Sequence, residues 1–421
     1  MMARLRSSKL VGEAATVLSG NVLAQGIALA AYFVLTRIYS PEDYGLFNIF
    51  YSYIEVLVIA STCKYELATV VADDDRQAAA VTRFALRLNT IVSCVLLAVA
   101  AALWLSGLLP AHFRPLGWMV LLIPPMVFFC GTSRIYSFVY NRYHRYRHIA
   151  LSETVNAGGG ALSKILLGLA GALPAGLPIG AVLGQAAANI NYRLGLRRLS
   201  LPPTTAAERK AAARAHRNYP LFVAPKDFIN TFSSNLPFLW AAAYFGRAEI
   251  GLFGLALTFT LQPVNLISSA IERVLYARTA EAVHSRQAIA PLLRRFVLPL
   301  AGAAVAVCVA AWFVAEPVFA FCFGSRWHGC GPYVQALLPW ALAAFVSTSL
   351  LYLPNVFSAQ RTELRFHIAM LLLRAAAIYI GIRMGSFLLT IRMFALASAA
   401  VHVALVVWYM MLVRRYSHSL D

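Results

Sequence analysis

Twelve apolar stretches fill this chain of 421 residues almost from end to end, and they limit its possible folds more than any other feature. About 20 consecutive apolar residues cross the hydrocarbon core of a bilayer as one helix. The longest polar connection, 195–220, is too short to fold as a soluble domain. The sequence therefore predicts a helical membrane protein. The stretches are roughly 16–35, 46–71, 88–109, 116–139, 149–170, 176–194, 221–245, 250–276, 296–314, 333–357, 364–384 and 387–413.

Composition excludes an ordinary soluble protein, since 60% of residues are hydrophobic, 13% are charged and the mean hydropathy is +0.68. A net charge of +19 would suit a nucleic-acid-binding protein, but the basic residues gather in alternate loops. With the N-terminus in the cytoplasm, 24 of the 36 Lys and Arg residues fall on the cytoplasmic side and 6 on the opposite side. This bias predicts a multi-pass membrane protein with both termini in the cytoplasm. Nucleic acid is not expected as a partner.

No motif points to a cofactor or a metal. The six cysteines form no CxxC pair, and no nucleotide-binding glycine motif occurs. Cys322 and Cys330 flank a short loop on the predicted outer side, where both a disulfide and two free thiols are possible. The basic N-terminal segment enters a full-length apolar stretch without a cleavage site, so we expect no cleaved signal peptide.

The chain contains a doubled pattern. A shift of 206 residues superimposes the Gly-Leu-Phe that begins at Gly45 on the one that begins at Gly251, and Glu66 on Glu272. The same shift places Asn21 on Asp227. We therefore expect an N-terminal lobe over 1–196, a cytoplasmic connector over 197–220 and a C-terminal lobe over 221–421. The predicted fold is all-α, with twelve transmembrane helices in two six-helix lobes that surround a central cavity and are related by a pseudo-twofold axis along the membrane normal.

Several segments resemble one family. Residues 36–47, TRIYSPEDYGLF, are similar to the first loop of the bacterial oligosaccharide flippases, which are the polysaccharide and O-antigen translocases of the multidrug/oligosaccharidyl-lipid/polysaccharide exporter superfamily. The similarity continues in order through 64–68 with the acidic run 73–75, 219–222, 236–237, 251–253, 323–327 and 338–340. One departure is His328-Gly329-Cys330, where the family usually has a more acidic or Ala-containing run.

The resemblance implies a transporter and not an enzyme. Family members move an oligosaccharide linked to undecaprenyl pyrophosphate from the inner to the outer leaflet, for O-antigen, capsule or exopolysaccharide assembly. Alternating access coupled to H⁺ or Na⁺ is implied, with the lipid-linked oligosaccharide, membrane lipids and glycan polymerases or glycosyltransferases of the pathway as partners. The glycan, the coupling ion and the oligomeric state do not follow from these residues.

Six basic residues within the apolar stretches are candidates for binding the pyrophosphate. A charge at mid-bilayer costs at least about 2.5–3.5 kcal/mol, so each needs a reason to be there. The planar fork of Arg suits phosphate. Structural ion pairs, or side chains that snorkel to the headgroups, are the competing interpretation. The candidates are Arg374, Lys164, Lys64, Arg273, Arg134 and Lys226.

Four acidic residues are candidates for ion coupling, namely Glu55, Glu66, Glu272 and Asp227. Glu55 and Glu66 are 11 residues apart in one predicted helix, which puts them on one face. A carboxylate that faces a cavity can bind a proton or Na⁺. For Asp227 and Glu272 we expect instead ion pairs with other helices, because adjacent residues of one helix point apart.

Two other functions stay open. A cation-coupled drug exporter of the same superfamily would prefer cationic substrates and an acidic cavity. A membrane polymerase or ligase would need a large outer loop with catalytic groups, and the largest, 316–332, offers Glu316, Arg326 and His328. The connector is expected to form either an amphipathic helix on the inner leaflet or a solvated basic linker.

Overall fold

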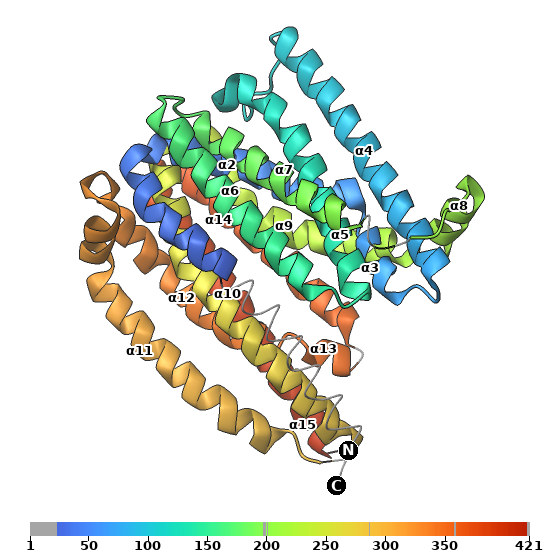
Figure 1. Ribbon diagram of the computed structural model, residues 1–421. Coiled ribbons are helices and arrows are strands. Elements are labelled where there is room, and N and C mark those ends of the chain that lie inside the picture. Colours follow the sequence, from blue (N-terminus) through green and yellow to red (C-terminus); the bar gives the residue numbers. More distant parts are fainter. Residues whose placement is uncertain (1–22, 197–198, 200, 286, 358, 419–421) are drawn as a thin grey trace. The chain divides into compact units, whose positions relative to one another are not determined.

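The chain folds entirely into helices, which form two compact units. The computed structural model describes residues 23–196, 199, 201–285, 287–357 and 359–418, and this part contains no β-strand. The N-terminal unit ends at Thr231 and the C-terminal unit begins at Phe232. The predicted fold class, an all-α membrane protein with two helical lobes, is confirmed (Figure 1). Asn21 and Arg197, which the sequence analysis used, lie outside the described residues.

Each predicted apolar stretch contains helical structure in its described part. The N-terminal unit contains a helix over Leu23–Ile38, followed by α2 (Pro41–Thr62), α3 (Tyr65–Val71), α4 (Asp75–Leu105), η1 (Arg114–Leu122), α5 (Ile123–Arg142), α6 (Tyr146–Leu169), α7 (Gly176–Leu196), α8 (Ala206–Ala215) and η2 (Tyr219–Val223). Helix α9 (Ala224–Leu239) crosses the boundary. The C-terminal unit continues with η3 (Ala241–Ala243), α10 (Arg247–His284), α11 (Ala290–Phe323), η4 (Ser325–Trp327), α12 (Cys330–Ser349), α13 (Leu353–Val356), α14 (Gln360–Met384) and α15 (Phe387–His418).

By length and hydropathy, 8 helices in the described part are suited to cross a membrane, and Leu23–Ile38 is a shorter apolar helix. Helices α6 and α7 are long enough but carry polar residues such as Glu153 and Lys164 in α6 and Gln185 in α7. Polar groups inside such a helix need partners on neighbouring helices. Gln185, for example, donates to the Ser133 hydroxyl of α5 at 2.7 Å.

The doubled pattern of the sequence has a local structural counterpart. Ser40 precedes α2, accepts a hydrogen bond from the Asp43 N–H, and its own N–H donates to the Asp43 carboxylate at 2.9 Å. The 206-residue shift places these positions on Gly246 and Glu249. There the Gly246 N–H donates to the Glu249 carboxylate at 3.3 Å at the start of α10. Both halves thus start their corresponding helix with a carboxylate at the third position.

The second predicted stretch is broken, which corrects one expectation. Cys63 and Lys64 have φ of 47° and 60°, so two successive non-glycine residues adopt the left-handed conformation and end α2. Glu55 lies on α2 and Glu66 on α3. The prediction that both carboxylates share one face of one helix is therefore wrong. The matching helix of the second half, α10, continues through the equivalent position.

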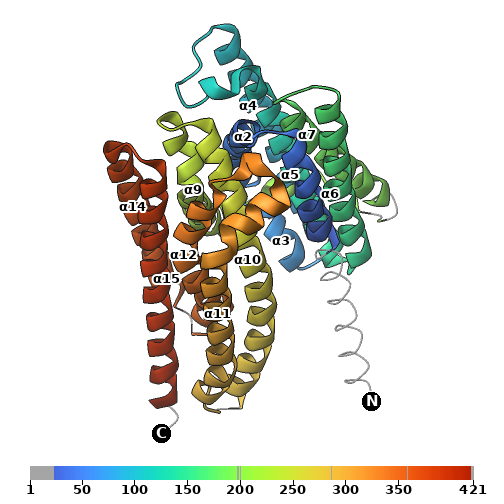
Figure 2. The ribbon, with the colours of Figure 1, turned by 90° about the vertical axis from the view of Figure 1, so that its left-hand side faces the viewer.

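Glycine allows α6 and α7 to pack backbone to backbone (Figure 1). A Cβ added at Gly184 of α7 would lie 2.6 Å from the Cα of Gly160 in α6. A Cβ at Gly180 would lie 2.7 Å from the backbone N of Lys164. These contacts fix the position of α6, the helix that carries Lys164, against α7. The C-terminal unit contains a comparable long contact between α14 and α15, which lie side by side in Figure 2.

The connector packs on the N-terminal unit. Thr205 and Glu208 cap α8 reciprocally, and the hydrogen bond from the Thr205 N–H lowers the pKa of the Glu208 carboxyl. Ala212 and Ala213 are buried, and the Tyr65 hydroxyl of α3 donates to the Ala213 carbonyl at 3.2 Å. The small apolar face of α8 thus contacts α3 and α4. Neither a lipid-bound helix nor a free linker describes this face.

The chain before the connector is held in the same way. Arg83 of α4 donates to the carbonyls of Pro202 and Leu201 and, at 3.0 Å, to the Thr204 hydroxyl. Backbone carbonyls outside regular structure need donors, and one guanidinium supplies several of them.

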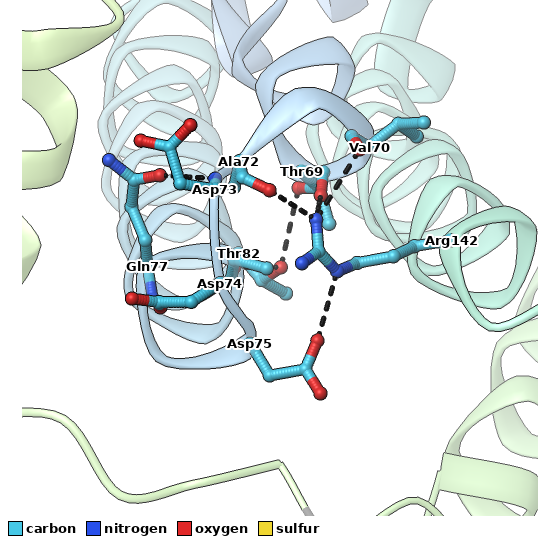
Figure 3. A network of polar contacts seen from close by, with 10 residues as sticks. Thr69, Val70, Ala72, Asp73, Asp74, Asp75, Gln77, Thr82 and Arg142 are labelled. Carbon is cyan, nitrogen blue, oxygen red and sulfur yellow. Dashed lines mark hydrogen bonds and ion pairs between the residues drawn. The ribbon is translucent and has the colours of Figure 1, made fainter.

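Arg142 at the end of α5 closes the turn between α3 and α4 (Figure 3). Its Nη1 donates to the carbonyls of Ala72, Thr69 and Val70 at 2.8, 3.1 and 3.3 Å, and its Nε donates to Asp75 at 3.1 Å. The last carbonyls of a helix lack partners within the helix, and Arg142 provides them. The acidic run 73–75 therefore has a structural role here, because Asp74 also caps α4 through the Gln77 N–H.

We expect Arg142→Ala to destabilise the folded chain by about 2 kcal/mol, because several charge-assisted hydrogen bonds are lost together. Arg142→Lys should recover little, since an ammonium cannot reach three carbonyls and a carboxylate from one position. Thermal unfolding in detergent measures both. The exposed Arg145→Ala is the matched control. Wild-type stability of the Lys variant would contradict the role of the guanidinium fork.

We expect Gly184→Ala to destabilise the chain by about 1–3 kcal/mol, because the added methyl group forces α6 and α7 apart. Gly158→Ala in α6 is the control, since an added Cβ there meets no atom within 4 Å. That control should be neutral or stabilising by up to about 1 kcal/mol, as alanine favours a helix over glycine. Equal melting temperatures for the two variants would refute the close contact.

Candidate functional site

The predicted basic residues are divided between the two units. Lys64, Arg134, Lys164 and Lys226 belong to the N-terminal unit, and Arg273 and Arg374 belong to the C-terminal unit. Each unit therefore provides its own charged site.

Arg374 of α14 is the centre of a polar site inside the C-terminal unit. Its side chain is 1% exposed. Nε donates to the Ser398 hydroxyl of α15 at 2.8 Å, and Nη1 donates to the hydroxyls of Ser233 and Ser234 of α9 at 3.2 and 3.1 Å. A buried guanidinium loses its hydrating water, and hydroxyl groups from two other helices accept its hydrogen bonds instead.

Two aromatic rings complete the surroundings of Arg374. Its guanidinium carbon lies 4.9 Å from the ring centroids of both Trp340 (α12) and Phe394 (α15). Ring faces attract a cation but carry no net charge. Among the described residues Arg374 forms no ion pair, so its positive charge is solvated without being neutralised. The unit therefore keeps a net positive charge at this point within its membrane-spanning helices.

Lys164 of α6 is the corresponding cation of the N-terminal unit. It is half-buried, and its Nζ lies 4.7 Å from the ring centroid of Phe47 on α2. The Tyr39 hydroxyl donates to its backbone carbonyl at 2.8 Å, which fixes the helix at this residue. No ion pair of Lys164 occurs among the described residues. As with Arg374, an aromatic face accompanies a charge that is not neutralised.

Lys64 and Asp227 form an ion pair within the N-terminal unit, with Nζ and Oδ2 2.8 Å apart and side chains that are 17% and 32% exposed. Lys64 is the left-handed residue between α2 and α3, and Asp227 lies in the first turn of α9. Asp227 thus has the partner on another helix that the sequence favoured. Lys64 points to a carboxylate, so a substrate anion would compete with Asp227 for it.

Glu55 and Arg134 belong to a polar face of the N-terminal unit. Glu55 and Tyr51 are one turn apart on α2, and Cys130 and Arg134 are one turn apart on α5. The charges of Glu55 and Arg134 both act on Tyr51, which is 40% exposed. A half-buried acid, a half-buried base and an exposed phenol on neighbouring helices form a surface that suits a polar ligand.

The other predicted site residues are placed as follows. Lys226 lies on α9 beside Asp227 and is half-buried. On α10, Arg273 is exposed and Glu272 is half-buried. Glu66 on α3 is 2% exposed, and its Oε2 has no hydrogen-bond partner. Arg273 therefore reaches the surface of the chain, whereas Glu66 does not.

Four ionisable residues were missed in the sequence. Glu153 of α6 lies 3.3 Å from the Tyr192 hydroxyl of α7, which donates to it. Glu363 and His367 of α14 form a contact, and His402 of α15 lies 2.7 Å from the Ser347 hydroxyl. The rule that drew attention to Arg374 applies to them too, because ionisable groups within membrane spans are rare. The histidines escaped notice because they count as neutral in a charge analysis.

The cysteines carry no cross-link in the described residues. Cys322 and Cys330 are both free, and the buried Cys330 donates to the Leu252 carbonyl at 3.6 Å. A ring nitrogen of His328 beside it lies 3.2 Å from the carboxylate of Glu316, which also accepts hydrogen bonds from the N–H groups of Gly329 and Gly331 at 2.7 and 2.6 Å. Glu316 and His328, two of the three groups that the loop 316–332 offers for catalysis, thus hold the start of α12.

Comparison with known sequences gives a family match and a relative. The family described as "Polysaccharide biosynthesis protein" matches residues 34–332. The succinoglycan biosynthesis transport protein ExoT of Rhizobium meliloti (strain 1021) is 24% identical over 337 residues, which are 79% of this chain and 66% of the relative. The chain thus spans just under two thirds of that protein.

Comparison with solved structures identifies the fold. The lipid II flippase MurJ in an inward closed conformation matches with a TM-score of 0.73 and 12% identity over 96% of this chain and 90% of that chain. A multidrug resistance MATE family transporter of the MOP superfamily, in its inward-facing conformation, matches with a TM-score of 0.65 and 13% identity over 94% and 96%. At these identities the likeness concerns the fold alone.

We expect the Lys64–Asp227 pair to contribute a coupling free energy of about 1–2 kcal/mol, between the values typical of exposed and buried pairs. A double-mutant cycle of Lys64→Ala and Asp227→Ala, read by unfolding in lipid nanodiscs, measures it. The Arg76–Glu208 pair, whose Arg side chain is 65% exposed, is the control and should give a smaller coupling. A coupling near zero for Lys64 and Asp227 would show that the contact does not hold α9.

Proposed function

The chain belongs to the polysaccharide biosynthesis protein family, and on that premise we propose that it moves a lipid-linked oligosaccharide across the membrane. The proposed substrate is an oligosaccharide on undecaprenyl pyrophosphate, carried from the inner to the outer leaflet of the bacterial cytoplasmic membrane with both termini inside. The named relative, a transport protein of succinoglycan biosynthesis, and the flippase-like fold support the transport of a lipid-linked glycan.

One observation carries the choice of an anionic substrate. Each unit holds a cation inside its membrane-spanning helices, Lys164 in one and Arg374 in the other, that no carboxylate neutralises among the described residues. An intramembrane charge costs free energy and is retained where it acts on a substrate or ion. A pyrophosphate head brings two negative charges, and a guanidinium binds such a group through parallel hydrogen bonds. Arg134, Lys64, Lys226 and Arg273 are proposed to assist its entry.

The proposed mechanism is alternating access, in which the two units move while the lipid tail remains in the bilayer. Helix α9 supports this mechanism because it is anchored in both units. Its first turn is held by Lys64 through Asp227, and its second half is held by Arg374 through Ser233 and Ser234. A motion can therefore break the Lys64–Asp227 pair and keep the hydrogen bonds of Arg374, or the reverse, and the two contacts lie on opposite sides of the unit boundary.

Ion coupling is a further part of the proposal. Glu55, Glu66, Glu272 and Asp227 are the candidates for binding H⁺ or Na⁺ in the cycle, and Glu55 is favoured because it shares a polar face with Tyr51 and Arg134. A ligand shifts the equilibrium between two states only by its difference in affinity for them. Any coupling ion must therefore bind one state better. No reaction on the glycan is proposed, so the chain is not proposed to be an enzyme, and pathway enzymes are proposed as partners.

The drug exporter is the second candidate, because a MATE transporter shares the fold. A carrier of cationic drugs would place carboxylates where this chain has Lys164 and Arg374. The fold alone does not separate the two functions, whereas the charge of these positions favours an anion.

We expect Arg374→Ala and Lys164→Ala each to slow transfer of an undecaprenyl-pyrophosphate-linked sugar by about tenfold or more, the cost of losing one charged hydrogen-bonding group. The measurement uses proteoliposomes and a membrane-impermeant reagent that modifies the sugar only after it crosses. Arg392→Ala, an exposed arginine of α15, is the control and should transfer sugar normally.

Unaltered transfer in both variants would remove these cations from the mechanism. Transport of a cationic dye by the wild type, without transfer of the lipid-linked sugar, would replace the proposal by the drug exporter. Melting temperature is measured for every variant, so that a loss of folding is not read as a loss of transport.

A further inference from the structure

Three ionisable residues follow one face of α14 from its first turn to its middle. Glu363, His367 and Arg374 are separated by four and seven residues, which is the spacing of a single helix face. Eleven residues of helix rise about 16 Å, about half the thickness of a bilayer core. Helix α14 is among those suited to cross a membrane. The row therefore leads from one end of the span to its interior.

The row begins, in the first turn of α14, with a contact between an acid and an imidazole. Glu363 Oε1 and His367 Nε2 are 3.7 Å apart, and the side chains are 5% and 13% exposed. The other ring nitrogen of His367, Nδ1, is buried without a hydrogen-bond partner. Buried polar atoms are nearly always paired, so an unpaired imidazole nitrogen beside a carboxylate needs an explanation.

His402 of α15 continues the row. Its Nδ1 lies 2.7 Å from the Ser347 hydroxyl of α12. It is close enough to His367 and to Arg374 for both charges to act on it. Ser398, one turn away on α15, accepts the hydrogen bond from Arg374. Two imidazoles therefore stand between a carboxylate at the end of α14 and a guanidinium at its middle.

Other ionisable groups lie beside this row. Glu272 of α10 is electrostatically close to Tyr409 and Tyr352, and Glu363 is close to Tyr409. Tyr409 is fully buried, and its hydroxyl has no hydrogen-bond partner. From α12 the described contacts are the Ser347 hydroxyl and the Trp340 ring. The ionisable set is thus Glu363, His367, His402 and Arg374, with Glu272 beside it.

We propose that Glu363, His367 and His402 form a proton-binding site within the C-terminal unit, and that its loading is linked to binding of the anionic substrate head. This linkage rests on the proposed function. Histidine is the side chain that ordinarily changes charge near neutral pH. An acid in the first turn of α14 also interacts favourably with the helix dipole, which accounts for Glu363 alone. It does not account for two imidazoles further along the span.

Charge balance gives the direction of the linkage. With both imidazoles neutral, Arg374 already carries a positive charge that no ion pair among the described residues neutralises. A proton taken up by either imidazole adds a further positive charge to this set. An anionic head near the unit then offsets that charge, so each ligand favours binding of the other. We therefore expect tighter binding of the anion at lower pH.

The site itself is tested without any substrate. Histidine-labelled full-length protein in nanodiscs is titrated from pH 8 to pH 5 by NMR, and signals are assigned with His367→Gln and His402→Gln. At least one of the two signals should move to the protonated position. Glu363→Gln should leave that histidine less protonated at the same pH, since a stabilising negative charge is lost. The exposed His284→Gln is the control and should change neither signal.

Two neutral signals that do not move over this range would overturn the proton site, and so would a titration that Glu363→Gln leaves unchanged. Glutamine keeps hydrogen-bonding groups at each position, and a second assigned signal reports on folding in every variant. If a variant fails to fold, the wild-type titration by itself still shows whether an intramembrane histidine binds a proton.

The linkage is tested with undecaprenyl pyrophosphate as the probe. Wild type should bind it about fivefold more tightly at pH 6 than at pH 8, and the variant with both histidines replaced should lose most of this difference. Equal pH dependence in the two proteins would overturn the linkage. Absence of binding at every pH would instead refute the proposed function, while the NMR titration would still decide the proton site.

Discussion

Every polar group inside a bilayer has to find its partners within the protein, and this requirement shapes both units. Arg374 shows how it is met. Serine hydroxyls from α9 and α15 and rings from α12 and α15 surround one guanidinium of α14, so three other helices contact a single side chain. The backbone follows the same rule where Arg142 collects the last carbonyls of α3. The helices that pack around a buried charge in this fold are therefore also the ones that supply its partners.

The helices were predictable because hydropathy acts locally. A run of apolar residues is helical in a membrane whatever its neighbours are, and each of the twelve stretches contains a helix in its described part. The breaks are different. Cys63 and Lys64 interrupt α2 although neither is glycine or proline, so no residue type announces the change. The ion pair between Lys64 and Asp227 suggests that tertiary contact selects this conformation.

Site residues were predictable in identity but not in partners. The rule that intramembrane charges need a reason identified Arg374 and Lys164, yet serine, the chief partner of Arg374, is too common to draw attention in a sequence. The expected one-helix alignment of Glu55 with Glu66 failed at the break before α3. The histidines of α14 and α15 were overlooked because a neutral group raises no question of cost until its burial is known.

Helix α9 has a mechanical consequence. The boundary between the units lies inside this helix, between Thr231 and Phe232, while the connector before it is fastened to α3 and α4. No slack loop separates the units at that point. Asp227, which pairs with Lys64, and the serines that bind Arg374 are therefore about two turns apart on one hydrogen-bonded helix, so its two ends respond to different charges. Ser233 and Ser234, which bind Arg374, lie on the C-terminal side of the unit boundary.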